Sequence, residues 1–405
     1  MSSEWTPTTW GELVSLEYGK AIRDYQNAIG GYPVFGTNGP IGFHHTPLCS
    51  TPGVIVGRKG AYRGIHYSKK PFFVIDTAFY LKPKIDLDLK WAYYCLLTYD
   101  INGMDSGSAI PSTSRDEFYK LPVNPPSLIE QKAIADLLGK FDDRITLLRE
   151  TNATLEAIAQ ALFKSWFVDF DPVRAKMEGR TPEGMDEATA ALFPDGFEES
   201  ALGLVPRGWR VRPLDEIATY LNGLALQKFP PSDDSWLPVI KISQLRKGDT
   251  VGADRAGRNI KPAYVIQNGD VLFSWSGSLE VEVWCGGEGA LNQHLFKVSS
   301  EIYPKWFYYL WTKHHLEHFR QVAASKATTM GHIQRAHLTQ ALVVAPPDAL
   351  VSVVSQFFAP LLDRWIATAL QAQTLATLRD TLLPRLISGA LRLPEVAVKL
   401  EESAA

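Results

Sequence analysis

Two long stretches of the chain space their hydrophobic residues alternately three and four positions apart, which is the pattern of a coiled-coil helix. The first stretch has its stripe positions at Ile134, Leu138, Phe141, Ile145, Leu148, Asn152, Leu155, Ala159, Leu162 and Trp166. The second has them at Val354, Phe358, Leu361, Trp365, Thr368, Ala372, Leu375, Arg379, Leu382 and Leu386. A helix with one apolar stripe has to bury that stripe against a partner. We therefore expect the two helices to pack antiparallel on each other; a parallel homodimer is the alternative.

Both stretches begin after a double proline, at Pro125-Pro126 and Pro346-Pro347. Ser127 and Glu130 fit a capping box, in which each side chain satisfies a free N–H group of the first helical turn. Asp348 is the expected cap of the second helix. At about 1.5 Å per residue the first helix is roughly 55 Å long.

The regions that precede the two helices repeat each other. Positions near the start recur at a constant offset, from Trp5, Trp10, Leu13, Leu16 and Gly19 to Trp209, Leu214, Ile217, Tyr220 and Gly223. Further along, Trp91-Ala92-Tyr93-Tyr94 corresponds to Trp306-Phe307-Tyr308-Tyr309. Short β-branched and aromatic runs predict strands, and the tryptophan motifs predict a helix in each region. The expected fold class is α+β: two similar globular α/β domains separated by a long antiparallel two-helix coiled coil, with an internal pseudo-twofold repeat.

The predicted order is a first domain, a first helix, a connector, a second domain, a second helix and a C-terminal tail. Their boundaries are 1–126, 127–170, 171–206, 207–347, 348–390 and 391–405. The connector begins where Asp169-Phe170-Asp171-Pro172 stops the first helix. Its apolar run Ala190-Ala191-Leu192-Phe193 predicts that the connector packs on something and is not a free linker.

The composition is that of a protein with several compact domains. The chain has 405 residues, of which 45% are hydrophobic and 21% charged. Cys49, Cys95 and Cys285 are few and far apart, so we expect neither disulfides nor a cysteine metal site, and a reducing cytoplasm as the location. We find neither a signal-peptide pattern nor the roughly 18 uninterrupted apolar residues of a membrane span.

The net charge of −3 argues against nucleic-acid binding by bulk positive charge, but basic residues cluster locally. Segment 52–75 contains no acid and carries five Lys or Arg residues among aromatic side chains. Basic, amide and hydroxyl side chains in such loops suit DNA bases and phosphates, although solvated loops are the alternative. The candidate DNA contacts are Lys20, Arg23, Asn38, Arg58, Lys59, Tyr62, Arg63, Ser108, Gln227, Lys228, Gln244, Arg246, Ser276, Lys326, Thr328 and His332.

Catalytic patterns are weak. His314 and His318 fit the His-x-x-Glu-His pattern of zinc peptidases, but a third ligand is not obvious. Asp76 with the Asp88-Leu89-Lys90 segment could form a nuclease metal cluster, yet Asn292 takes the place of Asp76 in the repeat. We therefore expect a binding protein without catalytic activity. A zinc hydrolase centred on His314 and His318, and a coiled-coil scaffold that binds protein, are the alternatives.

Two segments resemble a known family. Phe163–Val173, with the sequence FKSWFVDFDPV, is similar to the central segment of the specificity subunits of type I restriction-modification systems, and Leu382–Gly389 resembles their C-terminal helix end. The order of globule, double proline and helix is similar over nearly the whole chain. The resemblance implies a non-catalytic subunit whose two target recognition domains each read one half of a split site in double-stranded DNA, while the coiled coil sets the spacer.

The resemblance also implies partners. Two methyltransferase (modification) subunits would dock on the coil and connector, and restriction subunits would join them. The implied docking residues are Phe163, Trp166, Phe167, Asp169, Phe170, Asp171 and Arg385. S-adenosylmethionine, ATP and Mg²⁺ are expected on the partner subunits, with no cofactor or metal bound by this chain.

Overall fold

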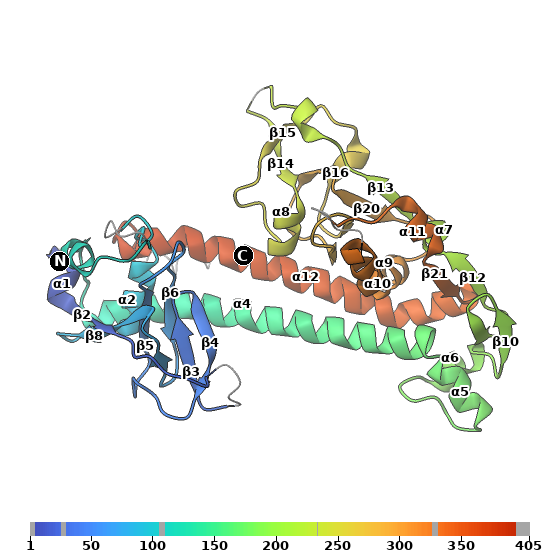
Figure 1. Cartoon of the computed structure of the whole chain (residues 1–405), viewed down its shortest axis with the longest axis horizontal. Coiled ribbons are helices and arrows are strands. Elements are labelled where there is room, and N and C mark those ends of the chain that lie inside the picture. Colours follow the sequence, from blue (N-terminus) through green and yellow to red (C-terminus); the bar gives the residue numbers. More distant parts are fainter. Residues whose placement is uncertain (1–4, 26–29, 105–109, 233, 326–330, 394–405) are drawn as a thin grey trace. The chain divides into compact units, whose positions relative to one another are not determined.

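The computed structural model describes residues 5–25, 30–104, 110–232, 234–325 and 331–393. The chain divides into two compact units, Met1–Ile145 with Leu375–Ala405, and Thr146–Thr374. Two long helices, α4 (Leu128–Phe163) and α12 (Asp348–Ile387), each contribute one part to either unit (Figure 1).

The described strands of the first domain, residues 8–123, form two larger sheets and one two-stranded sheet. The four-stranded antiparallel sheet has the order β2-β8-β5-β6, from Val14–Tyr18, Ala78–Pro83, Gly53–Gly57 and Ile65–Ser68. The three-stranded sheet has the order β4-β3-β7, from Gly39–His44, Tyr32–Gly36 and Phe73–Val74, with β3 and β7 parallel. The remaining elements are the paired strands β1 (Thr8–Thr9) and β9 (Pro122–Val123), and the helices α1 (Trp10–Leu13), α2 (Leu89–Leu96) and α3 (Arg115–Lys120).

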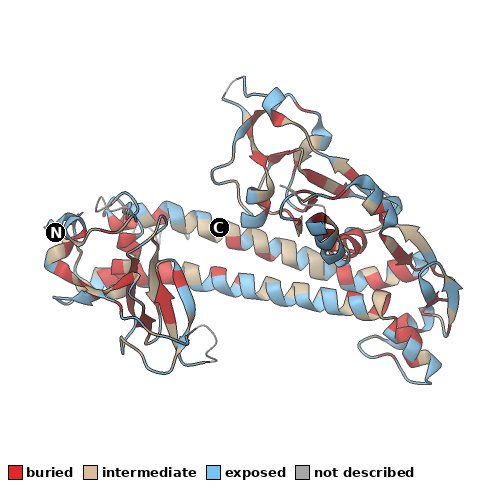
Figure 2. Ribbon diagram, in the orientation of Figure 1, coloured by how far each residue is buried: buried red, intermediate tan, exposed pale blue. Residues whose placement is uncertain are grey.

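The second domain, residues 210–345, repeats this plan. Its antiparallel sheet has the order β13-β20-β17-β18, from Thr219–Asn222, Leu295–Ser299, Val271–Ser274 and Val281–Val283. The other sheet has the order β15-β14-β19-β16, from Arg255–Gly257, Trp236–Ile240, Gly289–Leu291 and Val265–Ile266, with β14 and β19 parallel. The remaining elements are the paired strands β12 (Arg210–Pro213) and β21 (Leu342–Ala345), the helices α7 (Leu214–Ile217), α8 (Ile242–Lys247), α9 (Lys305–His314), α10 (Leu316–Ser325) and α11 (Arg335–Gln340), and the 3-10 turns η2 (Leu226–Lys228) and η3 (Pro262–Tyr264). Equivalent strands follow the same order in both four-stranded sheets, which confirms the predicted repeat, and strands supply much of the buried core of each domain (Figure 2).

Two glycines identified by the repeat lie against backbone at matched places. A Cβ atom on Gly19 would lie 2.0 Å from the carbonyl oxygen of Ile75, and one on Gly223 would lie 2.1 Å from that of Asn292. Only glycine permits so close an approach. The structure therefore pairs Ile75 with Asn292, and the sequence pairing of Asp76 with Asn292 is wrong by one residue.

In the first unit, the start of α4 packs antiparallel against the end of α12. Leu138 and Leu386 are fully buried in the core of the first domain. The Asp142 carboxylate of α4 accepts a hydrogen bond of 2.6 Å from Arg379 of α12 and another from the hydroxyl of Tyr94 in α2. Burial and this carboxylate raise the pKa of Tyr94, so its hydroxyl stays a donor. The intramolecular pairing of the helices is thus confirmed.

The predicted start of α4 is also confirmed. The Ser127 N–H donates to the Glu130 carboxylate at 3.2 Å, and the Glu130 N–H donates to the Ser127 hydroxyl at 3.3 Å. This reciprocal pair is the expected capping box. Asp348 is the first residue of α12.

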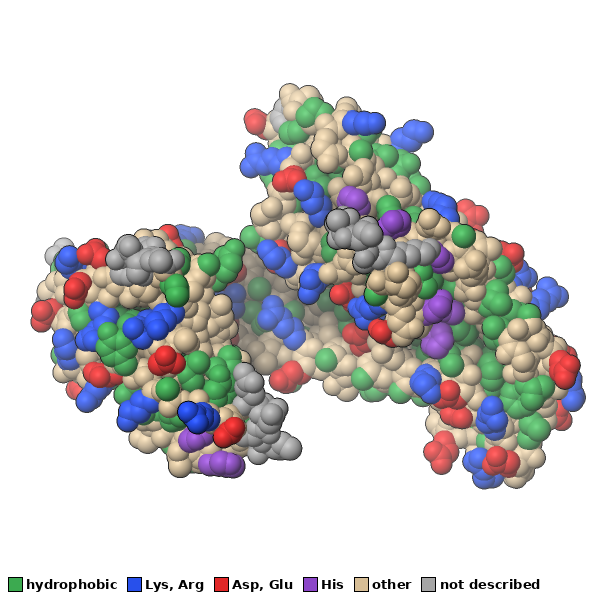
Figure 3. All heavy atoms as spheres, in the orientation of Figure 1, with side chains coloured by type: hydrophobic (Ala, Val, Ile, Leu, Met, Phe, Trp, Pro, Cys, Tyr) green, Lys and Arg blue, Asp and Glu red, His purple; other side chains and the backbone are tan. Residues whose placement is uncertain are grey.

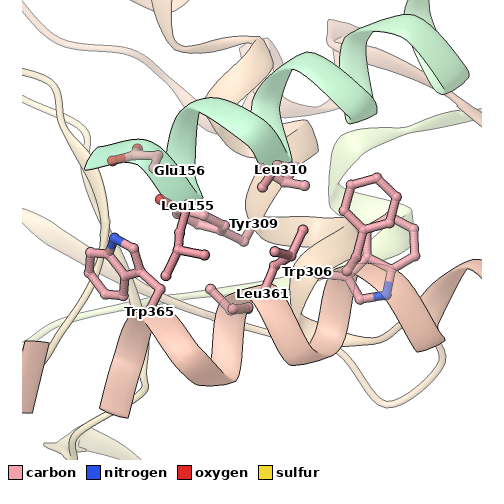
Figure 4. Close-up of a pocket in the computed structure, with 10 residues that line it drawn as sticks. Leu155, Glu156, Trp306, Tyr309, Leu310, Leu361 and Trp365 are labelled. Atoms are coloured by element: carbon pink, nitrogen blue, oxygen red, sulfur yellow. The ribbon is translucent and has the colours of Figure 1, made fainter. Parts of the chain in front are cut away.

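In the second unit, α9 packs against both long helices. Leu155 of α4, Tyr309 of α9, and Leu361 and Trp365 of α12 face one another (Figure 4). They line a cavity of about 20 Å³, room for about one water molecule. One turn before Leu155 in α4, the amide of Asn152 donates to the carbonyl of Trp365 at 3.1 Å, so this polar stripe position bonds the two helices together.

A charged cluster ties α9 to α4 and the sheet of the second domain. The Lys313 ammonium forms an ion pair with Glu156 of α4 and lies 3.5 Å from the carboxylate of Glu282 in β18. The Lys313 side chain is only 17% exposed. Burial raises the pKa of Glu282, and Lys313 opposes that rise.

The connector forms its own small elements. They are a π-helical turn, η1 (Lys164–Val168), the helices α5 (Asp171–Met177) and α6 (Glu187–Leu192), and the hairpin of β10 (Phe197–Ser200) and β11 (Gly203–Pro206). Phe170 adopts a left-handed backbone conformation, with φ of 57°, where the chain turns from η1 into α5. Phe193 is 1% exposed in the core of the second unit, so the prediction that the connector packs is confirmed.

Helix α12 is long and apolar enough, by length and composition, to cross a membrane, a feature that the sequence analysis did not anticipate. Its apolar residues are used within the fold. Leu350, Val354 and Phe358 are buried in the core of the second unit, and Leu382 and Leu386 in that of the first. These positions of α12 therefore serve intramolecular packing.

Candidate nucleic-acid interface

In the first domain, a loop follows β5 and is held by backbone hydrogen bonds. The Arg58 N–H donates to the Thr77 carbonyl at 2.9 Å, and the Arg58 carbonyl accepts from the Thr113 N–H at 2.9 Å. The Gly60 N–H donates to the Pro111 carbonyl at 3.0 Å. Two neighbouring segments thus fix the loop on both sides, so the direction of its side chains is set by the sheet.

The Arg58 side chain is held in place without being neutralised. Its guanidinium lies 4.8 Å from the centre of the Tyr18 ring and 5.7 Å from that of Phe79, and it donates to the backbone carbonyl of Asp76 at 2.9 Å. Arg115 contacts the same ring: its guanidinium lies 5.1 Å from the centre of the Tyr18 ring. Cation–π contacts of this kind orient a guanidinium while leaving donors for a ligand.

Most other first-domain candidates lie on the surface. Lys20, Arg23, Asn38 and Lys59 are exposed, and Tyr62 is 78% exposed. Ser108 falls outside the described residues. These side chains are available for a partner, which is consistent with the predicted contacts without testing them.

Arg63 has a different role from the one predicted. Its side chain is buried, with the residue only 3% exposed. The guanidinium donates to the carbonyls of Gly60 at 3.1 Å, Asn102 at 2.7 Å and Met104 at 3.1 Å. These bonds occupy the two terminal nitrogens of the guanidinium inside the domain, and the residue is buried, so Arg63 positions the loop and is not placed for the predicted direct contact.

In the second domain, an equivalent set of backbone hydrogen bonds holds the loop after β17; we call this set of bonds the loop frame. The Trp275 N–H donates to the His294 carbonyl at 3.3 Å, and its carbonyl accepts from the Ile333 N–H at 3.0 Å. The Gly277 N–H donates to the Gly331 carbonyl at 2.8 Å. Each bond has a counterpart in the first domain, which places Trp275 in the position of Arg58.

The Trp275 side chain lies beside the sheet that is equivalent to the one beside Arg58. Its ring centre lies 5.9 Å from that of Phe296, and its Nε1–H donates to the side-chain oxygen of Asn222 at 3.0 Å. Arg335 lies beside it, with its guanidinium 5.5 Å from the Phe296 ring and a hydrogen bond to the Tyr220 carbonyl. Arg115, Trp275 and the site role of Arg335 were missed, although Arg115 and Arg335 both begin the short helix that precedes β9 or β21.

The remaining second-domain candidates divide into surface and buried residues. Gln227, Lys228, Arg246 and His332 are exposed. Gln244 and Ser276 are buried: the Gln244 side chain accepts from the Lys241 N–H at the start of α8, and the Ser276 hydroxyl bonds His294 at 3.0 Å. Their polar groups support the local fold instead of making the predicted direct contacts. Lys326 and Thr328 fall outside the described residues.

An open polar pocket of about 290 Å³ lies next to this loop frame. Gln227, Lys241, Ser243, Gln293 and His294 contribute to its lining. On the face shown in Figure 3, Lys and Arg side chains are interspersed with Asp and Glu instead of forming one block. This face therefore offers individual polar and basic groups and not one continuous basic patch.

The implied docking residues also divide by burial. Phe163, Trp166 and Phe167 are at most 3% exposed, and Phe170 is 8% exposed, all within the core of the second unit. Their aromatic rings hold the connector together and are not a free docking surface. The polar members face outward: Asp169 pairs with Lys164, Asp171 accepts from Ser165 at 2.8 Å, and Arg385 is exposed.

The geometry of the histidines does not suit the zinc alternative. Helix α9 ends at His314 and α10 begins at Leu316, so His314 and His318 belong to different helices. The zinc pattern needs both histidines on one continuous helix. Among the described residues, no group of three or more His, Cys, Asp or Glu side chains is arranged to hold a metal ion. Asp88, from the nuclease alternative, caps α2 by accepting the Trp91 N–H at 2.8 Å.

Comparison with known proteins gives one consistent family. A family model described as "Type I restriction modification DNA specificity domain" matches residues 2–157 and again 206–350. The type I restriction enzyme MjaIX specificity subunit of Methanocaldococcus jannaschii is 24% identical over 328 residues, covering 78% of this chain and 72% of that protein. The HindI specificity subunit of Haemophilus influenzae is 24% identical over 375 residues, covering 79% and 81%. The crystal structure of a type I restriction-modification S subunit from M. genitalium has a similar fold, with a TM-score of 0.58, 16% identity and coverage of 96% of this chain and 97% of that one.

Proposed function

Because this chain belongs to the family of type I restriction-modification DNA specificity subunits, which recognise DNA and are not the catalytic subunits, we propose that its two domains read the two halves of a split DNA site. One observation carries the proposal. Each domain has the same loop frame beside an equivalent sheet, but the frame carries Arg58 in the first domain and Trp275 in the second. Matched frames with different side chains suit two half-sites of different sequence.

The two long helices set the spacing between the half-sites. Helix α4 has 36 residues and α12 has 40, which correspond to about 54 and 60 Å of helix. A distance of that order spans roughly 16 base pairs, enough for two short half-sites and an unread gap. A bond between the helices is present within each unit, Arg379 with Asp142 in the first and Asn152 with Trp365 in the second.

The proposed complex contains further subunits. Two methyltransferase subunits dock on the coil and the connector, where Asp169, Asp171 and, at the end of α12, Arg385 offer outward polar groups, and restriction subunits join them. The partner subunits bind S-adenosylmethionine, ATP and Mg²⁺, and this chain binds none of the three. The complex works in the cytoplasm, where the cellular DNA is.

Selection from random duplexes tests this function. The chain, purified together with its methyltransferase subunits, is incubated with a library of random duplex DNA, and bound molecules are sequenced. We expect two short conserved blocks separated by a gap of constant length. The methyltransferase subunits without this chain serve as the control and should enrich no such motif. A single continuous block, or no enrichment by the full complex, would contradict the proposal.

A further inference from the structure

The two loop frames define one position twice. Arg58 follows β5, and Trp275 follows β17. Their N–H groups donate to the carbonyls of Thr77 and His294, the residues just before β8 and β20. Their carbonyls accept from the N–H groups of Thr113 and Ile333. The strand pairing agrees, because Gly57 pairs with Ala78 and Ser274 with Leu295. Arg58 and Trp275 therefore project from equivalent backbone.

The surroundings of this position combine constant and exchanged residues. Phe79 and Phe296 are equivalent, since they pair with Tyr18 and Asn222 in matched strands. Arg115 and Arg335 add a cation beside the site in both domains. The exchanged pair is Arg58 on Tyr18 in the first domain and Trp275 bonded to Asn222 in the second.

The first version of the pair offers directed donors. One nitrogen of Arg58 is bonded to the Asp76 carbonyl, and the ring of Tyr18 supports the guanidinium from one face. The remaining N–H groups form a planar fork, which matches the O6 and N7 acceptors of guanine in the major groove. Since the fork is held before DNA arrives, little side-chain entropy is lost on binding.

The second version offers an apolar surface. The only donor of an indole ring is its Nε1–H, and in Trp275 this group is already bonded to Asn222. The part of the ring that remains accessible can therefore make only apolar contact with a base edge. In the major groove the apolar group of a base is the 5-methyl of thymine.

We propose that positions 58 and 275 are one specificity-determining position of the repeat, which reads a guanine through Arg58 in the first domain and a thymine methyl through Trp275 in the second. The inference rests on the proposed function, because it assumes that both domains read DNA. It adds which side chains distinguish the half-sites and which atoms of the bases they contact.

The test uses base analogues in the selected duplex, bound by the chain together with its methyltransferase subunits. Each guanine of the first half-site is replaced in turn by 7-deazaguanine, which lacks N7, and each thymine of the second half-site by uracil, which lacks the methyl group. For the wild-type complex we expect one guanine at which the replacement weakens binding about tenfold. We expect one thymine at which it weakens binding about fourfold.

Variants assign these effects to the two residues. Arg58→Ala should bind normal and 7-deazaguanine duplexes equally well, while the thymine effect in the other half-site persists. Arg58→Lys keeps the charge but loses the planar fork, so it should show a smaller guanine effect than wild type. Trp275→Ala should lose the thymine effect, and Trp275→Phe should retain it because the ring surface remains. Lys70→Ala is the matched control, an exposed cation near the opposite end of β5, and should preserve both effects.

The outcomes separate this inference from the proposed function. If wild-type complex selects no two-part site, the proposed function fails. If it selects one but the analogue effects persist unchanged in Arg58→Ala or in Trp275→Ala, the assignment of this position is overturned. Loss of all binding in Arg58→Lys, with folding unchanged by thermal unfolding, would overturn it as well, because a charge-preserving change at a readout position should cost discrimination and not all affinity.

Discussion

Lengthening α4 and α12 together should lengthen the gap between the half-sites. The insertion is placed at the boundary of the two units, after residue 145 in α4 and before residue 375 in α12. This boundary lies between two contacts that join the helices, Asp142 with Arg379 and Asn152 with Trp365. Both contacts are preserved when equal heptads are added to each helix, because a heptad keeps the stripe in register.

Length and rotation together predict which insertions work. One heptad adds about 10.5 Å, or three base pairs, and three heptads add about 31.5 Å, or nine base pairs. A left-handed coil with a pitch of about 150 Å turns back by about 25° and 75° over these lengths. DNA turns forward by about 105° over three base pairs and about 315° over nine. The two rotations disagree by about 130° after one heptad but by only about 30° after three.

We therefore expect the three-heptad variant to methylate the same half-sites with a gap about nine base pairs longer, measured by methylation mapping. The one-heptad variant should act weakly, at a gap about three base pairs longer. Five residues in each helix are the control, since they rotate the stripe by about 140° and should abolish activity. An active lengthened variant with an unchanged gap would refute the role of the helices as a ruler.

Two further predictions concern stability. Gly19→Ala and Gly223→Ala force a Cβ into the carbonyls of Ile75 and Asn292 and should each cost about 1–3 kcal/mol in thermal unfolding; unchanged melting in both would contradict the close approach. Lys313→Met leaves Glu156 and Glu282 facing each other without their cation, and we expect a loss of about 2 kcal/mol at pH 8, below the cost of breaking a fully buried pair because these groups are partly exposed. Burial raises the pKa of Glu282 in the folded protein, and Lys313 lowers it. Removing Lys313 therefore raises this pKa further. The loss of stability in the variant should then become smaller as the pH falls and the Glu282 carboxyl takes up a proton. A deficit that is the same at pH 8 and pH 5 would contradict this account; Lys305→Met is the control, an exposed lysine of the same helix.

The sequence predicted the long helices, the repeat and the capping box because each has a local signal. Spacing of apolar residues fixes a helix face, a constant offset reveals a repeat, and Ser127 with Glu130 lies within one helical turn. Gly19 and Gly223 gave a reliable pairing because the backbone approach allows no other residue. Insertions after them shift the offset, which explains the error of one residue at Asn292.

The candidate site was less predictable because exposure is a tertiary property. Arg63 and Lys59 lie in the same basic segment, but only Arg63 is buried, where its guanidinium donates to the carbonyls of residues 102 and 104. Lys59 is exposed. The aromatic residues of the central segment were predicted to dock a partner, but they are buried in a core that they share with helices of the second domain. The repeat aligns Trp275 with Arg58 in the sequence, but Trp275 was not named as a contact because a tryptophan after a buried strand usually signals core; the backbone hydrogen bonds of its loop show that it occupies the position of Arg58.

Methylation mapping of genomic DNA tests the central claim most directly. A host that carries this chain and its methyltransferase subunits is compared with a host that lacks only this chain. The account predicts a split, two-part methylated motif in the first host and its complete loss in the second. An identical methylation pattern in both hosts, with the methyltransferase active, would contradict the claim that this chain selects the DNA sequence.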